Sequence, residues 1–403
     1  MKAFRNFAQI ATLQGVHQKD GRKLLPQDLS ILSDASLIFD QDKILWVGED
    51  KNFPSDYSQI SFEDFSGHVM LPELVDSHTH AIFGGDRANE YSRRLNGEDY
   101  VEISKAGGGI LNTMNGTRNL SNEKLFDDCV ERLERIYSYG VGTVEVKSGY
   151  GLSYHKEYAL SHVIQKVKEH FKGKLQVINT FMAAHAIPPE FNTSLSYLEE
   201  VCFPLMETLQ SEEIIDCVDI FHEQGYFSNS DTELFFKKAV ELKVPIKSHA
   251  DEFNDNKGAV LAAKYKALSA DHLLCTGKDG IKALAKSSTV ATLLPGTGMF
   301  LGKSQADARA FLDAGAKLAI ASDYNPGSCH CDNVLLLASI SAPLLKLNMC
   351  EMWAAITYNA AHALGLKNQG VLAEGKLPRF SIFKTDSIDR ITYNWGRNLS
   401  IRG

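Results

Sequence analysis

The sequence has no long hydrophobic run, no excess of positive charge and no paired cysteine motif, and each absence excludes a class of protein. Its longest apolar stretch, residues 334–345, is too short to span a bilayer and contains Pro343. Acidic residues outnumber basic ones by 50 to 42, for a net charge of -8, and no basic stripe marks a nucleic-acid-binding face. We therefore predict a protein that binds neither membrane nor nucleic acid.

The cysteine usage indicates a reducing compartment. Seven cysteines, an odd number, are spread along the chain without a Cys-x-x-Cys pair, as is typical of free thiols in the cytoplasm. The first residues, Met-Lys-Ala-Phe-Arg, are not followed by the apolar segment of a signal peptide, so we predict a cytoplasmic location. The triplet Cys329-His330-Cys331 is too tightly spaced for a standard structural zinc site, which favours ordinary loop residues.

Both ends of the chain have the pattern of short β-strands. Residues 36–40 and 43–47 are alternating apolar stretches on either side of Gln41-Asp42, which predicts a strand–turn–strand unit. Beyond residue 366 we expect further short strands around Gly370, Gly375 and Ile382 and at 391–395. We predict that residues 1–66 and 367–403 meet in one small composite β-sandwich domain.

The middle of the chain, residues 67–366, alternates short apolar runs with longer amphipathic stretches such as 121–139 and 155–171. Eight such alternations predict a parallel α/β fold, namely a (β/α)8 barrel, although an open doubly wound sheet would have the same periodicity. The connection from about 76 to 140 is long enough for more than one helix. The eight runs are 68–75, 141–146, 175–182, 217–221, 244–247, 268–270, 290–294 and 317–321.

Ionisable residues follow most of these runs, at the ends where barrel active sites are built. A lone histidine after a strand is usually an ordinary loop residue, and a His-x-His pair is common by chance. His78 and His80, however, lie two apart in extended chain and point the same way, and His249 and Asp323 follow later runs. Three neutral imidazoles and one carboxylate suit a dication that lowers the pKa of a bound water to near 7. The joint pattern therefore predicts a metal-dependent hydrolase.

These motifs resemble the amidohydrolase superfamily, and within it the branch that opens an imidazolone ring in histidine degradation. The resemblance covers nearly the whole chain. The His-x-His pair and the late aspartate are shared across the superfamily, whereas Lys147-Ser-Gly-Tyr-Gly-Leu152 and Ser322-Asp-Tyr-Asn-Pro-Gly-Ser328 are specific to this branch. The other matching stretches are 71–80, 83–87, 107–111, 184–189, 249–252 and 270–272.

The resemblance implies a (β/α)8 barrel with a β-sandwich built from both chain ends. It also implies one zinc or iron ion per chain, bound by residues matching His78, His80, His249 and Asp323. Many superfamily members hold two metals through a carboxylated lysine. In this branch the site is mononuclear, so Lys147 is expected to be a structural residue or a neighbour of the ligands.

The implied reaction is hydrolysis of 4-imidazolone-5-propanoate to N-formimidoyl-L-glutamate. Water attacks a ring carbonyl and a C–N bond breaks. The catalytic residues implied by the match are Glu252, at the ring nitrogens, with His272 and Asp323, which would hold the proton of the attacking water. From the residues alone, Glu252 next to Asp251 would be read as a solvated acidic loop.

The resemblance also places the residues that bind the substrate. Arg87 with Tyr150 would hold the propanoate, because a guanidinium pairs with a carboxylate through two parallel hydrogen bonds. The alternative for Arg87 is a surface ion pair with Asp86 or Glu90. His185 matches a substrate-contacting position. A loop that would hold the new carboxylate, through backbone N–H groups, contains Asn325, Gly327 and Ser328.

Two rival functions remain at this point. A deaminase of a purine-like or pyrimidine-like ring would have the same ligands, but its substrate has no carboxylate for Arg87 and Tyr150. A catalytically silent scaffold would have lost ligands, and all four candidates are present. The chain departs from the superfamily at Gly375-Lys-Leu-Pro-Arg-Phe-Ser381, in the predicted small domain and away from the metal. The expected partner is a small-molecule substrate, with a homodimer as the default assembly.

Overall fold

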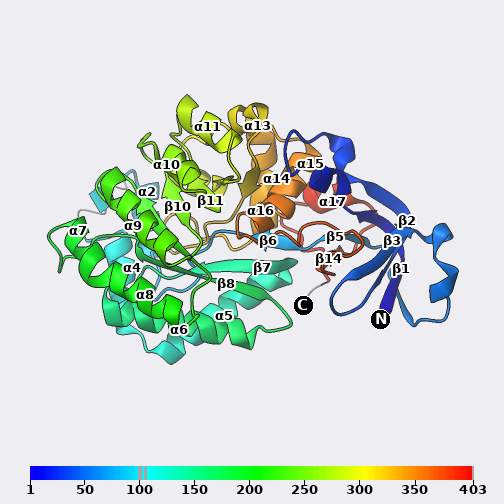
Figure 1. Ribbon diagram of the computed structural model, residues 1–403, viewed down its shortest axis with the longest axis horizontal. Helices are drawn as coiled ribbons and strands as arrows, with labels where there is room; N and C mark the ends of the chain where they lie inside the picture. Colours follow the sequence, from blue (N-terminus) through cyan, green and yellow to red (C-terminus); the bar gives the residue numbers. More distant parts are fainter. Residues whose placement is uncertain (99–101, 104–106, 402–403) are drawn as a thin grey trace.

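A computed structural model describes residues 1–98, 102–103 and 107–401, and in it two β-sheets lie side by side along the long axis of the molecule (Figure 1). The larger sheet has eight parallel strands in the order of the chain, which confirms the predicted α/β barrel. Its strands are β6 (Leu74–Asp76), β7 (Val141–Lys147), β8 (Gln176–Ala184), β9 (Cys217–His222), β10 (Lys247–Ala250), β11 (Ser269–His272), β12 (Val290–Leu293) and β13 (Leu318–Ile320).

Main-chain hydrogen bonds just beyond β6 and β13 close the ring of strands. Thr79 and Tyr324 form a parallel bridge there. The Asp323 N–H donates to the carbonyl of His78 at 3.0 Å, and the His80 N–H donates to the carbonyl of Tyr324 at 2.9 Å. The seam of the barrel therefore lies next to three of the predicted metal ligands.

Amphipathic helices cover the outside of the barrel. In α5 the buried residues Leu125, Cys129, Leu133 and Ile136 recur every three or four positions, and the Ser121 side chain accepts a hydrogen bond from the Lys124 N–H at the helix start. The predicted helices at 121–139 and 155–171 are confirmed as α5 and α6. Beyond β6, the barrel helices are α2 (Ala88–Leu95), α4 (Ile110–Asn119), α5 (Asn122–Ser138), α6 (Tyr154–His170), α7 (Ser194–Tyr197), α8 (Phe203–Ser211), α9 (Asn229–Glu241), α10 (Gly258–Lys264), α11 (Lys278–Ala285), α12 (Pro295–Leu301), α13 (Ala308–Ala314), α14 (Val334–Leu344), α15 (Met349–Ala355) and α16 (Tyr358–His362), with a π-helical turn at Leu198–Cys202.

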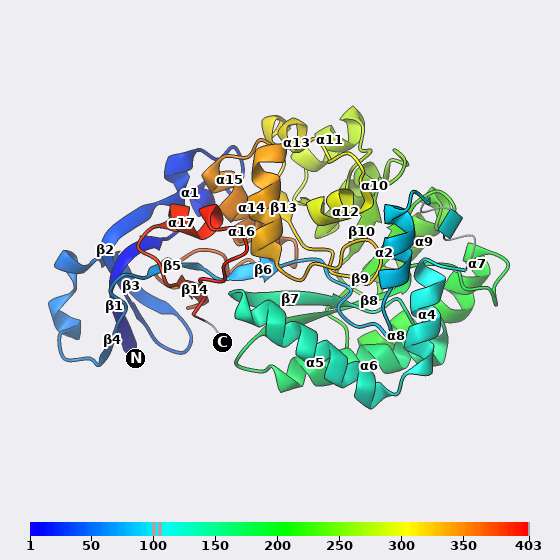
Figure 2. The ribbon, with the colours of Figure 1, turned by 180° about the vertical axis from the view of Figure 1, so that it is seen from behind.

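The smaller sheet takes strands from both ends of the chain, as predicted (Figure 2). Strands β2 and β3 form the expected antiparallel hairpin, and β14 pairs with β5. The six strands are β1 (Lys2–Ala11), β2 (Ile31–Phe39), β3 (Ile44–Glu49), β4 (Phe62–Asp64), β5 (Val69–Pro72) and β14 (Phe380–Phe383). The same part of the molecule contains α1 (Gln14–Gln18), α17 (Ile388–Tyr393) and 3-10 turns at Pro26–Leu29, Asp50–Asn52 and Ser55–Tyr57.

Three strand predictions were wrong. The run 68–75 is not one barrel strand, because Glu73 separates β5, in the smaller sheet, from β6, in the barrel. The segment 391–395 is not a strand, because Ile391 belongs to α17, in which Ile388 and Ile391 are buried one helical turn apart and Ser387 caps the first turn. The strands expected around Gly370 and Gly375 were also wrong, because the residues there form connecting loops; only the strand around Ile382 is confirmed, as β14.

No helix in the described ranges combines the length and the apolar character that crossing a membrane requires. The apolar run at 334–345 is the barrel helix α14, which buries Val334, Leu337 and Ala338.

Candidate metal centre and substrate pocket

Three histidines and one aspartate converge at the carboxyl end of the barrel. The Nε2 atoms of His80 and His249 lie 3.3 Å apart. Asp323 Oδ1 lies 3.5 Å from His78 Nε2 and 3.6 Å from His80 Nε2. One nitrogen from each histidine falls within 4.8 Å of the others, so the predicted ligands are brought together.

The surroundings of these histidines fit a bound dication. His78 Nδ1 lies 2.6 Å from Asp271 Oδ2, and His249 Nδ1 lies 3.1 Å from Asp219 Oδ2. The Asp271 hydrogen bond holds the proton of His78 on Nδ1 and leaves its Nε2 lone pair for a metal, whereas the contact of Asp219 with His249 Nδ1 is not aligned as a hydrogen bond. His78 Nε2 is buried without a hydrogen-bond partner among the described residues. Burial lowers the pKa of His78, His80 and His249 well below the usual value, which keeps them neutral, as ligands must be.

A layer of buried charges lies beneath the ligands. Lys147 Nζ is 2.6 Å from Asp219 Oδ2 and 2.7 Å from Glu145 Oε2, and Lys247 Nζ is 3.4 Å from both Glu145 Oε2 and Asp271 Oδ2. Burial alone would lower the pKa of Lys147, but Asp219 and Glu145 raise it above its usual value. Lys147 therefore contacts two carboxylates, which agrees with the structural role expected for it.

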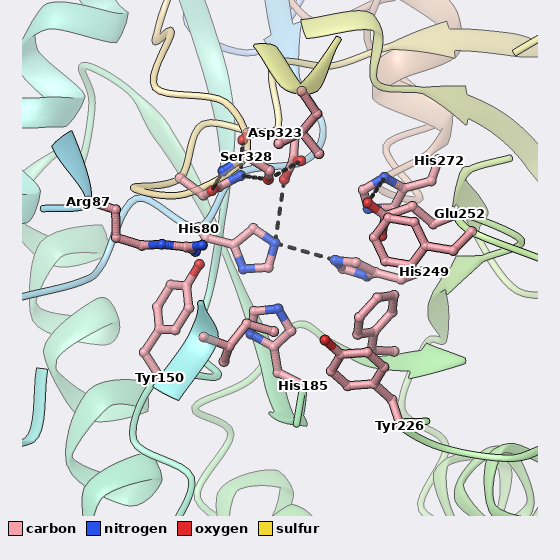
Figure 3. A pocket seen from close by; sticks show the side chains of 15 residues that line it. His80, Arg87, Tyr150, His185, Tyr226, His249, Glu252, His272, Asp323 and Ser328 are labelled. Carbon is pink, nitrogen blue, oxygen red and sulfur yellow. Dashed lines mark hydrogen bonds and ion pairs between the residues drawn. The ribbon is translucent and has the colours of Figure 1, made fainter. Parts of the chain in front are cut away.

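A pocket opens above the predicted ligands. Figure 3 shows its side chains arranged around His80. Of the predicted site residues, His78 and Gly327 do not line the pocket. The predicted site residues that line the pocket are His80, Arg87, Tyr150, His185, His249, Glu252, His272, Asp323, Asn325 and Ser328.

Glu252, His272 and Asp323 form the part of the pocket that can hold protons. Glu252 is only 8% exposed, so it is not a solvated loop residue, and its Oε1 lies 3.7 Å from His272 Nδ1. Burial, and then the charge of Asp323, raise the pKa of Glu252 well above its usual value. Burial lowers the pKa of His272 to about 4 and raises that of Asp323 to about 7. Thr297 donates to Asp323 Oδ2 at 2.5 Å, opposite the oxygen that faces the histidines.

Arg87 and Tyr150 lie together at the other end of the pocket (Figure 3). The Arg87 Nε–H donates to Glu90 Oε2 at 2.8 Å, so the ion pair considered for Arg87 exists, but it is buried instead of lying on the surface. Gly327 makes room for this arginine, because a Cβ there would meet Arg87 Nη1 at 1.7 Å. The N–H groups of Gly327 and Ser328 donate to Asn325 Oδ1 at 2.7 and 2.8 Å. These two backbone N–H groups are therefore already hydrogen-bonded within their own loop.

His185 lies between the two ends of the pocket. Its ring stacks on that of His80, with centroids 4.9 Å apart, and its Nδ1 lies 3.0 Å from the carbonyl of Gly149. Burial lowers the pKa of His185 to about 4, so the ring is neutral near pH 7.

Several residues of the site escaped the sequence analysis. Phe221 packs against Tyr226 and Phe253, with ring centroids 4.4 and 6.4 Å apart, and the three form an aromatic wall of the pocket. Phe221 ends an apolar run, so its pattern is that of any buried strand residue. Asp219 and Asp271 lie within β9 and β11. In the sequence, the only sign of their position is that side chains alternate between the two faces of a strand. Among the described residues, no possible metal cluster includes the Cys329-His330-Cys331 triplet.

Comparison with known proteins first defines the class. The chain matches the model of the amidohydrolase family over residues 69–401 and therefore belongs to that family. It is 40% identical over 370 residues to the imidazolonepropionase of Idiomarina loihiensis (91% of this chain, 90% of the relative) and 37% identical over 395 residues to that of Bacillus velezensis (98% and 93%). Within the amidohydrolases, the chain is a member of the imidazolonepropionase family.

Solved structures agree on the fold. A zinc-bound variant of atrazine chlorohydrolase from Arthrobacter aurescens superposes with a TM-score of 0.71 at 16% identity, over 99% of this chain and 93% of that one. A zinc-bound adenosine deaminase from Xanthomonas campestris superposes with a TM-score of 0.68 at 15% identity, over 99% and 90%. At such low identity these neighbours establish the barrel and do not bear on the substrate.

Proposed function

We propose that this chain hydrolyses 4-imidazolone-5-propanoate to N-formimidoyl-L-glutamate, the third step of histidine degradation. The observation that carries the proposal is the pairing, in one pocket, of a hydrolytic His/Asp centre with the buried guanidinium of Arg87 beside Tyr150. A substrate that uses both ends needs a hydrolysable ring and a carboxylate a few bonds away. The imidazolonepropionase relatives support the same substrate.

The proposed cofactor is one zinc or iron ion per chain, held by His78, His80, His249 and Asp323. Both metals suit imidazole and carboxylate ligands. When bound, such an ion polarises a carbonyl and makes a water acidic enough to attack at neutral pH.

The side chains supply binding, orientation and proton transfer. Arg87 and Tyr150 hold the propanoate, and His185 contacts the ring. Asp323, whose second oxygen is fixed by Thr297, accepts the proton of the attacking water while the hydroxyl adds to the ring carbonyl carbon. Burial and the charge of Asp323 raise the pKa of Glu252 well above its usual value, which favours the protonated carboxyl, the form that donates to the ring nitrogen as the C–N bond breaks.

His272 lies within reach of Glu252, and we assign it the role of orienting that carboxyl. The Asn325–Ser328 loop closes the pocket on the Asp323 side. Its Asn325 Nδ2 donates to Ser328 Oγ at 2.8 Å, and the Ser328 hydroxyl donates to Asp323 Oδ2 at 3.5 Å, a long bond from which we propose that it turns to the new carboxylate.

The decisive experiment is turnover of freshly generated 4-imidazolone-5-propanoate by purified protein, with metal content measured on the same sample. We expect N-formimidoyl-L-glutamate, lost on chelation and restored by zinc or iron. No turnover with about one metal per chain would discard the substrate and direct the search to ring deamination. No turnover and no metal uptake would favour a silent scaffold.

We also keep two structural predictions as proposals. The first is the division into a composite β domain (1–66 and 367–403) and a barrel (67–366). The second is a homodimer, which is supported by an apolar face around α14 and α17 where Leu344, Tyr393 and Trp395 are 59%, 84% and 56% exposed. Light scattering of the purified protein tests the second, and Trp395→Glu should shift the population towards monomer.

A further inference from the structure

Two buried glutamates outside the pocket hold the loops that present its side chains. We propose that Glu223 and Glu157 are positioning residues for the proposed reaction, Glu223 for the proton donor Glu252 and Glu157 for the propanoate-binding Tyr150. Neither lines the pocket. The inference rests on the proposed function. It predicts that the loop held by Glu223 affects mainly kcat and that the loop held by Glu157 affects mainly KM.

Glu223 follows β9 and fixes the loop after β10. Its carboxylate is 1% exposed. Oε2 accepts from the Phe253 N–H at 2.8 Å and from the Asn254 N–H at 3.3 Å. Oε1 accepts from the side-chain amides of Asn254 at 3.0 Å and Asn256 at 2.5 Å. Because Phe253 directly follows Glu252 in the chain, these bonds fix the backbone from which the Glu252 carboxyl reaches the pocket.

Glu157 lies in the first turn of α6 and is fully buried. Oε1 accepts from the N–H groups of Gly151 at 2.6 Å and Leu152 at 2.9 Å, and Oε2 accepts from the Gly149 N–H at 3.0 Å. Tyr150 lies in the middle of this loop. The carbonyl of Gly149 lies 3.0 Å from His185 Nδ1, so the same carboxylate also fixes a second group that contacts the substrate.

A carboxylate is required at both places because several N–H donors converge on it. Glutamine has nearly the same shape, but it replaces one acceptor oxygen by an NH₂ donor. At Glu157 that NH₂ would face a loop N–H in either orientation. At Glu223 it would face either the Phe253 and Asn254 N–H groups or the Gln224 N–H, which donates to Oε1 at 2.7 Å. A buried polar group without a partner is costly. The loop is expected to shift, and a misplacement of about 1 Å at a reacting group can cost roughly a hundredfold in rate.

The consequences separate by loop. In Glu223→Gln the propanoate end is untouched and proton donation by Glu252 is impaired, so kcat should fall at least about tenfold with KM within about threefold of wild type. In Glu157→Gln the proton donor is untouched and the propanoate end is loosened, so KM should rise at least about tenfold with a smaller change in kcat. A residue that only stabilised the fold would not produce opposite patterns at the two sites.

The matched control is Glu351→Gln. Glu351 is 5% exposed, caps α15 and binds Arg309 at 2.8 Å, away from the pocket. It should lower the melting temperature without moving kcat or KM. All variants are compared with their full metal complement, and Glu223→Asp and Glu157→Asp replace any glutamine variant that fails to fold. The inference is overturned if Glu223→Gln keeps the wild-type kcat, or if both glutamine variants change kcat and KM in the same proportion.

Hydrogen exchange on the same samples separates this inference from the proposed function. Glu223→Gln should speed exchange of the Phe253 and Asn254 amides, and Glu157→Gln that of Gly149, Gly151 and Leu152, each without effect on the other loop. If the wild type does not turn over the imidazolone, the proposed function fails, and exchange alone then decides whether these carboxylates hold the loops. Unchanged protection in both variants would refute the inference even in an active enzyme.

Discussion

Asp271→Asn tests whether the carboxylate behind His78 prepares the metal centre. Asp271 is fully buried, and its Oδ2 lies 2.6 Å from His78 Nδ1. The carboxylate holds the proton on Nδ1 and leaves Nε2 to the metal. An asparagine fits the same space, but its NH₂ can donate to Nδ1, which would move the ring proton to Nε2, where the metal binds.

Loss of such a partner typically weakens metal binding about 10- to 100-fold, or about 1.4–2.7 kcal/mol. The short distance and complete burial favour the upper part of that range for Asp271. Asp219→Asn should lose less, because the Asp219–His249 distance is 3.1 Å. The assay is competition for Zn²⁺ between metal-free protein and a chromophoric chelator at fixed pH. Asp231→Asn, which removes a capping carboxylate of α9, is the control. An Asp271→Asn affinity within about threefold of wild type would refute the role of the carboxylate.

Three further outcomes follow from the structure. His249→Ala should abolish turnover and reduce bound metal while circular dichroism stays native, and full activity without metal would contradict its role as a ligand. Arg87→Ala should raise KM about 10- to 100-fold, because a charge-assisted pair is lost, whereas an unchanged KM would remove Arg87 from the propanoate site. Burial, and then Lys317, lower the pKa of His362 to about 4, so the unfolded chain binds the extra proton first and stability is lost as pH falls from about 6.5 towards 4. The free energy of unfolding, measured with urea at pH 7 and at pH 5, should fall between these pH values by on the order of 2 kcal/mol less in His362→Gln than in the wild type. The same fall in both proteins would exclude His362 as a source of the pH dependence.

The parts of the site that could be predicted from the sequence are those set by local chain geometry. His78 and His80 are two apart in extended chain, and the carboxyl ends of parallel strands meet at one face, so His249 and Asp323 could be expected beside them. Glu157 could not be recognised, and Glu223, which follows a strand, was as consistent with simple packing as with a place beside the site, because the function of both depends on where backbone N–H groups converge after folding. The segment 391–395 was misread because a short apolar pattern fits a strand as well as one turn of helix.

The burial of Arg87 shows a similar limit. Its ion pair with Glu90 was considered from their spacing, yet its enclosure depends on Gly327, more than two hundred positions away in the chain. Long-range packing of this kind leaves no trace in local periodicity.

The seam of the barrel would link uptake of the proposed metal ion to the completion of folding. His78 and His80 follow β6, the first barrel strand, and Asp323 follows β13, the last, and each of these strands has only three residues. The proposed ligand set is therefore complete only when the first and last strands have met across the seam. During synthesis, the histidines emerge long before the aspartate, so a nascent or truncated chain lacks a complete coordination sphere. Metal acquired at that point joins two distant parts of the polypeptide, and its loss should release the shortest strands of the barrel first.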